Sequence, residues 1–181
     1  MKLKETPLKD CFILEPAVFK DERGIFFESY NKKVLREYLN KHIDFIQDNH
    51  SISAKGVLRG LHYQNGSYAQ TKLVRVIGGE VIDVVVDIRK QSKSFGECFK
   101  IRLSEENKKM LFVPKGLAHG FLALDNNTQF IYKCDQYYKK EAEGGIIYND
   151  PDLNIDWEFP SERIILSEKD KKLPFLKELD L

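Results

Sequence analysis

An arginine and a histidine interrupt the apolar, glycine-punctuated run GVLRGLHYQ at residues 56–64. Such side chains are costly to bury unless other groups pair with them. An imidazole can move a proton near neutral pH, and a planar guanidinium suits a phosphate. Strict alternation along a strand puts Arg59 and His62 on opposite faces, but a strand glycine such as Gly60 often marks a bulge that re-aims a side chain. The run therefore predicts a strand that carries part of a polar site.

Three more polar side chains lie in β-type runs among aliphatic residues. Lys72 opens TKLVRVIGGEVIDVVVDIR on the same strand face as Val74 and Val76, His119 lies in LAHGFLAL, and Tyr132 lies in TQFIYKC. Each residue alone is typical of an ordinary core or strand-end position, where a lysine stem or a tyrosine reaches the surface with its polar tip. Together, two histidines, a lysine and a tyrosine on one β-rich chain indicate a polar pocket rather than a dry core.

Asp170 has two interpretations. Ser167-x-x-Asp170 has the spacing of a helix capping box, in which side chains bond to backbone amides. The same carboxylate is also suited to act in a pocket with the histidines. The pattern alone leaves both interpretations open.

A bound metal is the first function to test, because jelly-roll barrels often hold one between histidines. Such a site needs a His-x-His pair and a carboxylate soon after it, so that ligands converge from adjacent strand positions. Here Gln64 stands in the second histidine position, and residues 66–68 are Gly-Ser-Tyr where a glutamate is needed. His42 and His50 have no matching spacing. The sequence therefore predicts no metal site.

The elements that must position these residues are mostly strands. Residues 71–89 form two β-branched runs joined at Gly78-Gly79, which predicts a hairpin. Residues 31–40 instead place apolar side chains on one helical stripe with Asn31 as its cap. The strand pattern continues at 96–103, residues 111–124 give two more apolar runs broken by a Pro-Lys-Gly turn, and residues 128–138 alternate again.

Short helical pieces complete the expected elements. One turn is predicted after Ser104, and one short helical piece in SEKDKKLPFLKEL at residues 167–179. Many short strands with few peripheral helices predict a mainly β fold, a sandwich or barrel, with a jelly roll as the expected version. No repeat, low-complexity segment or linker divides the chain, so we expect one domain over residues 1–181.

Charge and cysteine content argue against several function classes. The formal net charge of +1 offers no broad electrostatic surface for nucleic acid or a membrane. Cys11, Cys98 and Cys134 are widely spaced without a CxxC pair, which favours a reducing, cytoplasmic setting over a disulfide framework. The N-terminal MKLKETPLKD lacks the apolar stretch of a signal peptide, and no segment reaches membrane-spanning length.

Long segments in order carry a resemblance that covers nearly the whole chain. The chain resembles the nucleotide-sugar 3,5-epimerases, the dTDP-4-dehydrorhamnose 3,5-epimerase family. The resemblance implies a cupin-type jelly roll without a cofactor, usually a homodimer, that inverts C3 and C5 of a nucleotide-linked 4-keto-6-deoxy sugar in polysaccharide biosynthesis. The matching segments are DERGIFFESYN (21–31), QDNHSISAKGVLRGLHYQ (47–64), QTKLVRVIGGEVIDVVVDIRKQSKSFG (70–96), VPKGLAHGF (113–121), YKCDQYYKKEAEGGIIYNDPDLNIDW (132–157) and LSEKDKKLP (166–174).

The resemblance also implies roles for individual residues. His62 matches the base that removes a proton beside the C4 ketone, and Asp170 matches the carboxylate that orients it. Lys72 matches the cation near the C4 oxygen, where enolate charge develops, and Tyr132 matches the acid on the opposite ring face. The other matched positions imply substrate contacts at Phe19, Arg23, Glu28, Gln47, Asp48, Asn49, Arg59, His119, Tyr138, Glu143 and Lys169.

Some of these contacts have a more specific implied role. Arg59 matches a diphosphate ligand, for which a guanidinium is well suited. Tyr138 matches an aromatic that stacks in the nucleotide–sugar site, and Phe19 matches one that stacks on the base. In this family the N-terminal segment can come from the neighbouring subunit, so Phe19 and Arg23 are expected to serve that subunit's pocket.

Alternatives remain open within and outside this family. Relatives act on other 4-keto sugars, including GDP-linked heptoses, and some invert C3 alone. A non-catalytic sugar-binding barrel needs the pocket but no acid and base on opposite faces. A metal-dependent cupin oxygenase would contain stoichiometric iron or a comparable metal.

Overall fold

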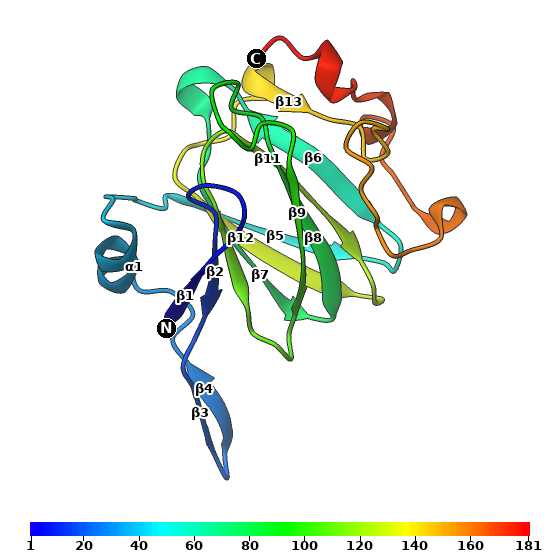
Figure 1. Ribbon diagram of the computed structural model, residues 1–181. Coiled ribbons are helices and arrows are strands. Elements are labelled where there is room, and N and C mark those ends of the chain that lie inside the picture. Colours follow the sequence, from blue (N-terminus) through cyan, green and yellow to red (C-terminus); the bar gives the residue numbers. More distant parts are fainter.

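Two antiparallel sheets form the body of the protein (Figure 1). The computed structural model describes all 181 residues. The larger sheet has the order β1 (Lys2–Glu5), β2 (Phe12–Glu15), β10 (Met110–Val113), β7 (Lys72–Gly78), β12 (Thr128–Cys134) and β5 (Gln47–Ser53). The smaller sheet has the order β13 (Glu143–Gly145), β6 (Leu58–Gln64), β11 (Leu117–Ala123), β8 (Glu80–Asp87) and β9 (Cys98–Ser104). The predicted mainly β architecture is confirmed.

Apolar side chains from both sheets fill the space between them. Phe121 of β11 and Phe130 of β12 stack across this space with ring centroids 4.1 Å apart. Val74 and Val76 of β7 are buried in the same cluster, so the face that they share with Lys72 points inward. The alternation predicted for the inner face of β7 is therefore confirmed.

The predicted hairpin at Gly78-Gly79 is wrong. β7 pairs with β10 and β12, whereas β8 pairs with β9 and β11 in the other sheet. Gly79 has φ +77°, a conformation that glycine adopts without strain, and the chain there crosses from one sheet to the other. A turn between paired strands and a turn between facing sheets carry the same glycine signal.

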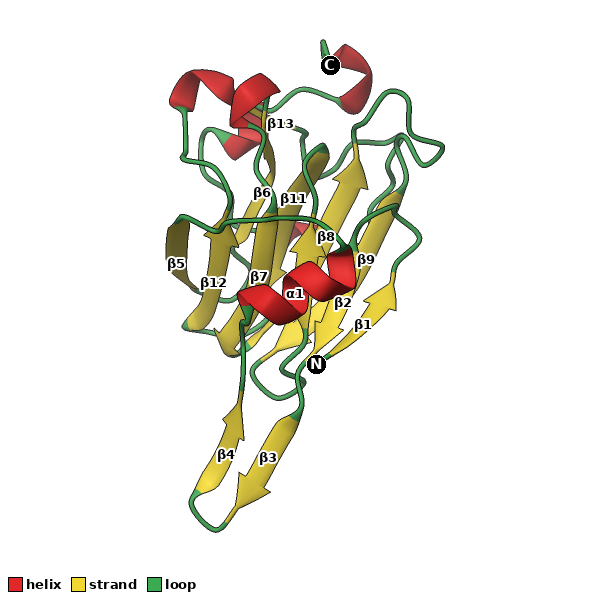
Figure 2. Cartoon of the chain, turned by 90° about the vertical axis from the view of Figure 1, so that its left-hand side faces the viewer, coloured by secondary structure: helices red, strands yellow, loops and turns green.

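The helix predicted at residues 31–40 is confirmed as α1 (Lys32–Leu39). Asn31 caps it, since its Oδ1 accepts a hydrogen bond from the Val34 amide at 3.1 Å, and Asn40 ends it in the left-handed conformation. The helix lies against the outer face of the larger sheet (Figure 2). Its Leu35 is buried in one cluster with Leu73 and its neighbours. This is the one α-helix, and no helix is long and apolar enough to cross a bilayer.

The C-terminal quarter of the chain covers the outer face of the smaller sheet. Ile146 and Trp157 are buried there against strands β6, β8 and β11. A parallel bridge between Val57 and Ile165 brings the chain back beside β6. The predicted helical piece consists of two 3₁₀ turns, η4 (Asp170–Lys172) and η5 (Leu176–Glu178). The other 3₁₀ turns are η1 (Gly66–Tyr68), η2 (Lys140–Ala142) and η3 (Ser161–Arg163).

Two local features complete the fold. After β9, Ser104 Oγ accepts a hydrogen bond from the Asn107 amide at 3.0 Å, which caps a single turn as predicted. The hairpin of β3 (Val18–Asp21) and β4 (Gly24–Phe27) projects away from both sheets (Figures 1 and 2). It belongs to neither sheet of the body.

A bulge in β6 turns Arg59 and His62 to the same side. In the pairing of β6 with β11, His62 faces His119 and Arg59 faces Phe121, so three steps on one strand match two on the other. The extra residue lies at Gly60, whose φ is +121°. The bulge predicted as a possibility at Gly60 is therefore present, and strict alternation is wrong for this strand.

Gly60 also packs directly against another backbone. A Cβ atom on Gly60 would lie 2.5 Å from Gly120 Cα, and one on Gly120 would lie 2.7 Å from the Arg59 carbonyl oxygen. Neither backbone can move aside without disturbing its sheet. The two glycines together let β6 and β11 pair through the bulge.

Gly60→Ala tests this contact against a matched control. Gly24 has nearly the same φ, +124°, but nothing lies within 4 Å of its added Cβ. We expect Gly60→Ala to lower the free energy of unfolding by about 2 kcal/mol more than Gly24→Ala, because only the first creates a clash. Urea unfolding measures both. Equal losses would contradict the packing role assigned to Gly60.

Candidate active site

A cavity of about 690 Å³ opens between the two sheets. It gathers polar side chains from β6, β7, β11, β12 and the C-terminal turn η4. The predicted site residues that line it are Arg59, His62, Lys72, His119, Tyr132, Lys169 and Asp170. Seven separately predicted residues therefore meet in one place.

His62 and Asp170 form the shortest polar contact of the cavity. His62 Nε2 lies 2.6 Å from Asp170 Oδ1, and Asp170 is almost completely buried. The Asp170 amide meanwhile donates to Ser167 Oγ at 3.1 Å. The turn is therefore capped by Ser167, while the Asp170 side chain is directed at the histidine. Only the Ser167 half of the capping box forms, and the Asp170 carboxylate follows the second interpretation, in which it acts in the pocket with a histidine.

The electrostatics of the pair determine which nitrogen can act as a base. Burial alone would raise the pKa of Asp170, but the hydrogen bond from His62 and its charge outweigh burial and hold this pKa below its ordinary value. A carboxylate accepts hydrogen bonds, so the neutral ring of His62 carries its proton on Nε2. Nδ1 is then the nitrogen with a free lone pair.

A buried carboxylate supports the two other basic residues of the site. Asp83 is fully buried, and its two oxygens lie 2.9 and 3.1 Å from His119 Nε2. Burial raises the pKa of Asp83, opposed by His119 and Lys72. Burial likewise lowers the pKa of Lys72, and the neighbouring Cys134 and Asp83 oppose this shift. Sequence reasoning missed Asp83, although alternation with Val81 and Val85 marks it as inward-facing.

Tyr132 faces the cavity from the opposite sheet to His62. It lies on β12 of the larger sheet, whereas His62 lies on β6 of the smaller one. Lys72 Nζ is 5.9 Å from the centroid of the Tyr132 ring. Burial, and then Cys134, raise the pKa of the Tyr132 hydroxyl, so it keeps its proton at neutral pH. The Tyr132 hydroxyl can therefore donate a proton across the cavity from His62.

Three predicted residues form a chain at the mouth of the cavity. Lys169 lines the cavity and its Nζ lies 2.7 Å from Glu143 Oε1. The Tyr138 hydroxyl donates to Glu143 Oε2 at 2.9 Å. Burial would raise the pKa of Glu143, but these two partners outweigh it and lower the pKa.

Two amide side chains of β5 extend this rim. Gln47 Oε1 accepts a hydrogen bond from the Tyr138 amide at 3.3 Å, and Gln47 Nε2 donates to Asn49 Oδ1 at 3.0 Å. Asn49 Nδ2 in turn lies 3.7 Å from Cys134 Sγ. Arg59 lines the cavity while remaining exposed; its Nε donates to Ser53 Oγ at 3.2 Å and no carboxylate pairs with it. Its guanidinium is free to bind an anion in the cavity.

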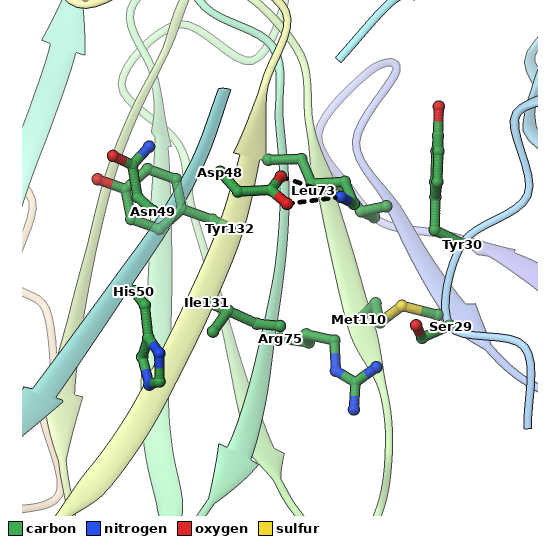
Figure 3. A pocket seen from close by; sticks show the side chains of 11 residues that line it. Ser29, Tyr30, Asp48, Asn49, His50, Leu73, Arg75, Met110, Ile131 and Tyr132 are labelled. Atoms are coloured by element: carbon green, nitrogen blue, oxygen red, sulfur yellow. Dashed lines mark hydrogen bonds and ion pairs between the residues drawn. The ribbon is translucent and has the colours of Figure 1, made fainter. Parts of the chain in front are cut away.

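Four predicted residues do not reach the cavity of their own chain. Asp48 lies on the outer face of the larger sheet, where it pairs with Lys133 at 2.9 Å beside a second pocket of about 290 Å³ (Figure 3). Phe19 and Arg23 lie on the projecting hairpin, and Arg23 pairs with Asp21 of the same hairpin. Glu28 follows the hairpin and accepts a hydrogen bond from Asn31 Nδ2 at 3.0 Å.

The cavity lacks the residue pattern of a metal centre. No group of three or more His, Cys, Asp or Glu side chains comes together in a way that could hold an ion. Gln64, in the position where a metal-binding barrel would carry its second histidine, has its carboxamide bonded to the backbone of Lys139. What the cavity does offer is an imidazole on one wall and, on the opposite wall, a protonated phenol with a lysine beside it. This set can remove a proton from one face of a ring and return one to the other face.

Comparison with known proteins agrees with this chemistry. The family described as dTDP-4-dehydrorhamnose 3,5-epimerase matches residues 5–178. A dTDP-4-dehydrorhamnose 3,5-epimerase from Shigella flexneri is 51% identical over 170 residues, which cover 94% of this chain and 93% of the relative.

Solved structures are similar over the whole fold. The dTDP-4-dehydrorhamnose 3,5-epimerase from Elizabethkingia anophelis NUHP1 has a TM-score of 0.97 and 52% identity, covering 100% of this chain and 99% of that one. The dTDP-6-deoxy-D-glucose-3,5-epimerase from Legionella pneumophila Philadelphia 1, in complex with dTDP-4-keto-L-rhamnose, has a TM-score of 0.95 and 46% identity, covering 99% and 94%. The cupin-type fold and the family that the resemblance implied are confirmed. The chain belongs to the dTDP-4-dehydrorhamnose 3,5-epimerase family.

Proposed function

We propose that this enzyme inverts C3 and C5 of dTDP-4-dehydro-6-deoxyglucose to form dTDP-4-dehydrorhamnose. One observation carries the proposal: the His62–Asp170 pair and Tyr132 face a single cavity from opposite sheets, with Lys72 beside them. The Legionella relative, a 3,5-epimerase with dTDP-4-keto-L-rhamnose bound, supports the same substrate class here.

In the proposed mechanism the ketone makes the neighbouring C–H bond acidic. His62 Nδ1 takes the proton from the carbon, and the electron pair of that bond moves through the carbonyl to the C4 oxygen. The Lys72 ammonium stabilises this enolate, and Asp83 helps to keep Lys72 charged. Tyr132 then donates its proton to the opposite face of the same carbon and recovers one from solvent, while His62 releases the proton it took to solvent. The net result at each centre is inversion without loss of atoms.

Arg59 binds the diphosphate in this proposal, and the rim of Tyr138, Glu143 and Lys169 receives the nucleoside. Arg59 suits the diphosphate because it lines the cavity without a carboxylate partner. The rim suits the nucleoside because Tyr138 is 53% exposed there and offers an aromatic face on which a base can stack.

We also propose a homodimer in which the β3–β4 hairpin of one subunit serves the cavity of the other. Phe19 and Phe26 on this hairpin are 65% and 72% exposed, which is unusual for such large apolar side chains unless another surface covers them. Phe19, Arg23 and Glu28 would then reach a substrate that they cannot reach within their own chain. Asp48 stays a predicted substrate contact, although it faces outward in the single chain.

A cytoplasmic location is part of the proposal. All three cysteines are free thiols, and Cys11 and Cys134 are buried. Unpaired cysteines suit a reducing compartment.

Removal of the base is the first test. His62→Ala should reduce epimerisation by roughly 10²–10⁴-fold, the usual contribution of a general base, because His119, the other imidazole on that wall, is bonded to Asp83 instead of Asp170. Binding of dTDP, measured by calorimetry, should change little. Asp170→Asn should cause a smaller loss of rate. Near-normal turnover of the His62 variant would reject the assignment, and an Asp170 variant that lost only thermal stability would leave that residue a structural role.

Removal of the acid should separate proton exchange from inversion. Tyr132→Phe keeps the ring and deletes only the hydroxyl, so His62 can still remove a proton and return it to the same face. In deuterated water we expect deuterium beside the ketone with little inverted product, provided that His62 exchanges its proton with solvent. Mass spectrometry and NMR of the sugar measure both outcomes. Inversion at the unmodified rate would assign the acid to water or Tyr138 instead.

Mixed dimers test whether the hairpin serves the other subunit. In a dimer of one His62→Ala chain and one Arg23→Ala chain, exchange leaves one cavity with both residues intact and the other with neither. We expect roughly half of the wild-type activity in such co-purified dimers, and much less in either parent. If each hairpin serves its own cavity, no intact site forms, and the mixed dimer would be no more active than the average of the parents.

A further inference from the structure

Gln64 makes an unusual pair of hydrogen bonds with one backbone residue. Its Oε1 accepts from the Lys139 amide at 2.8 Å, and its Nε2 donates to the Lys139 carbonyl at 3.1 Å. The Gln64 side chain thus offers Lys139 the donor and acceptor that a neighbouring strand would offer. Gln64 is only 8% exposed, so water competes little for these bonds.

Lys139 belongs to the segment that carries Tyr138 across the mouth of the cavity. On one side, the Tyr138 amide is held by Gln47 of the larger sheet. On the other side, Lys139 is held by Gln64 of the smaller sheet. Residues 138–139 therefore bridge the two sheets, with one glutamine at each end of the bridge. The bridge sets where the Tyr138 ring and its partner Glu143 stand relative to the cavity.

The same strand also positions the base. Gln64 lies two residues after His62 on β6, and the two face Glu143 and Gly145 of β13 in register. A shift of the Lys139 backbone therefore also moves Tyr138, Glu143 and Lys169, which are linked by hydrogen bonds. The position of the His62 ring is instead set by its bond to Asp170. Gln64 can therefore influence one end of the cavity without the other.

We propose that Gln64 is a positioning residue for the nucleoside diphosphate end of the substrate. Its carboxamide clamps Lys139 and so fixes the Tyr138–Glu143–Lys169 rim over the cavity. The identity of the ligand, a nucleoside diphosphate, is taken from the proposed function. The clamp itself is a property of the free protein.

The test uses Gln64→Met, which keeps the length of the side chain and removes both hydrogen bonds. We expect the Kd for dTDP and the KM for the dTDP-sugar each to rise about tenfold, the effect of losing two ordinary hydrogen bonds. kcat should stay within about twofold, because the base, the acid and the cation do not contact this clamp. Amide hydrogen exchange in the ligand-free protein should become faster at Tyr138 and Lys139.

Gln70→Met is the matched control. Gln70 Nε2 donates to the Gln136 carbonyl at 2.8 Å, so it holds the same loop by a single bond away from the bridge. Its Kd and KM should stay close to wild type. Gln64→Glu is the second variant, because it keeps the acceptor for the Lys139 amide but sets a carboxylate against the Lys139 carbonyl. We expect it to raise the Kd as well, and it covers the case in which the methionine variant does not fold.

A double-mutant cycle distinguishes positioning from a general loss of structure. If Gln64 acts through Tyr138, then Gln64→Met should add little to the Kd of a Tyr138→Ala variant. Additive losses, a drop in kcat at unchanged Kd, or an equal effect of Gln70→Met would each overturn the proposal. A different result would refute only the proposed reaction. In that case the protein would bind dTDP tightly and show the expected hydrogen-exchange pattern, but it would have no epimerase activity.

Discussion

One hydrogen bond joins the two parts of the chain on which the chemistry depends. His62 lies in the body of the smaller sheet and Asp170 in a turn 108 residues later, yet their side chains meet at 2.6 Å. Hydrogen bonds to charged groups contribute about 1.5–3 kcal/mol. Because the pKa of Asp170 is lowered in the folded protein, this contribution is present at neutral pH and is lost as the pH falls through that lowered pKa. The same bond therefore fixes the His62 ring, the proposed base, and holds the C-terminal segment.

Both ends of that bond need a dedicated backbone arrangement. On β6, the bulge at Gly60 turns His62 into the cavity together with Arg59, and its close approach to Gly120 allows no side chain. At the other end, the apolar side chains of the C-terminal segment cover the smaller sheet and bring Asp170 back over it. Apolar packing on the outer face of the smaller sheet thus positions the Asp170 carboxylate beside His62, whose side chain lies on the inner face. Packing and catalysis in this epimerase are linked through a single strand.

The sequence predicts much of this protein where local pattern decides the outcome. The helix capped by Asn31 and the inward face carrying Lys72 follow from periodicity alone, and both are confirmed. Contacts between distant segments do not follow from periodicity, so the residue pattern leaves the partner of Asp170 open, and only the family resemblance points to His62 before the fold places the two together. A turn at Gly79 looks alike whether the chain returns to the same sheet or crosses to the other. Asp83 was missed because one carboxylate in a β-branched run has no spacing partner; its partner, His119, comes from another strand.

The protonation state of His62 is the most direct test of the central claim, that Asp170 holds this ring so that Nδ1 is the base. Two-bond ¹H–¹⁵N NMR of the ring distinguishes the two nitrogens in the ligand-free protein. We expect Nε2 to carry the proton at neutral pH and Nδ1 to be unprotonated, with this preference weakened in Asp170→Asn. A proton on Nδ1 and a bare Nε2 at the same pH would contradict the account, because the nitrogen assigned as base would then have no lone pair to accept a proton.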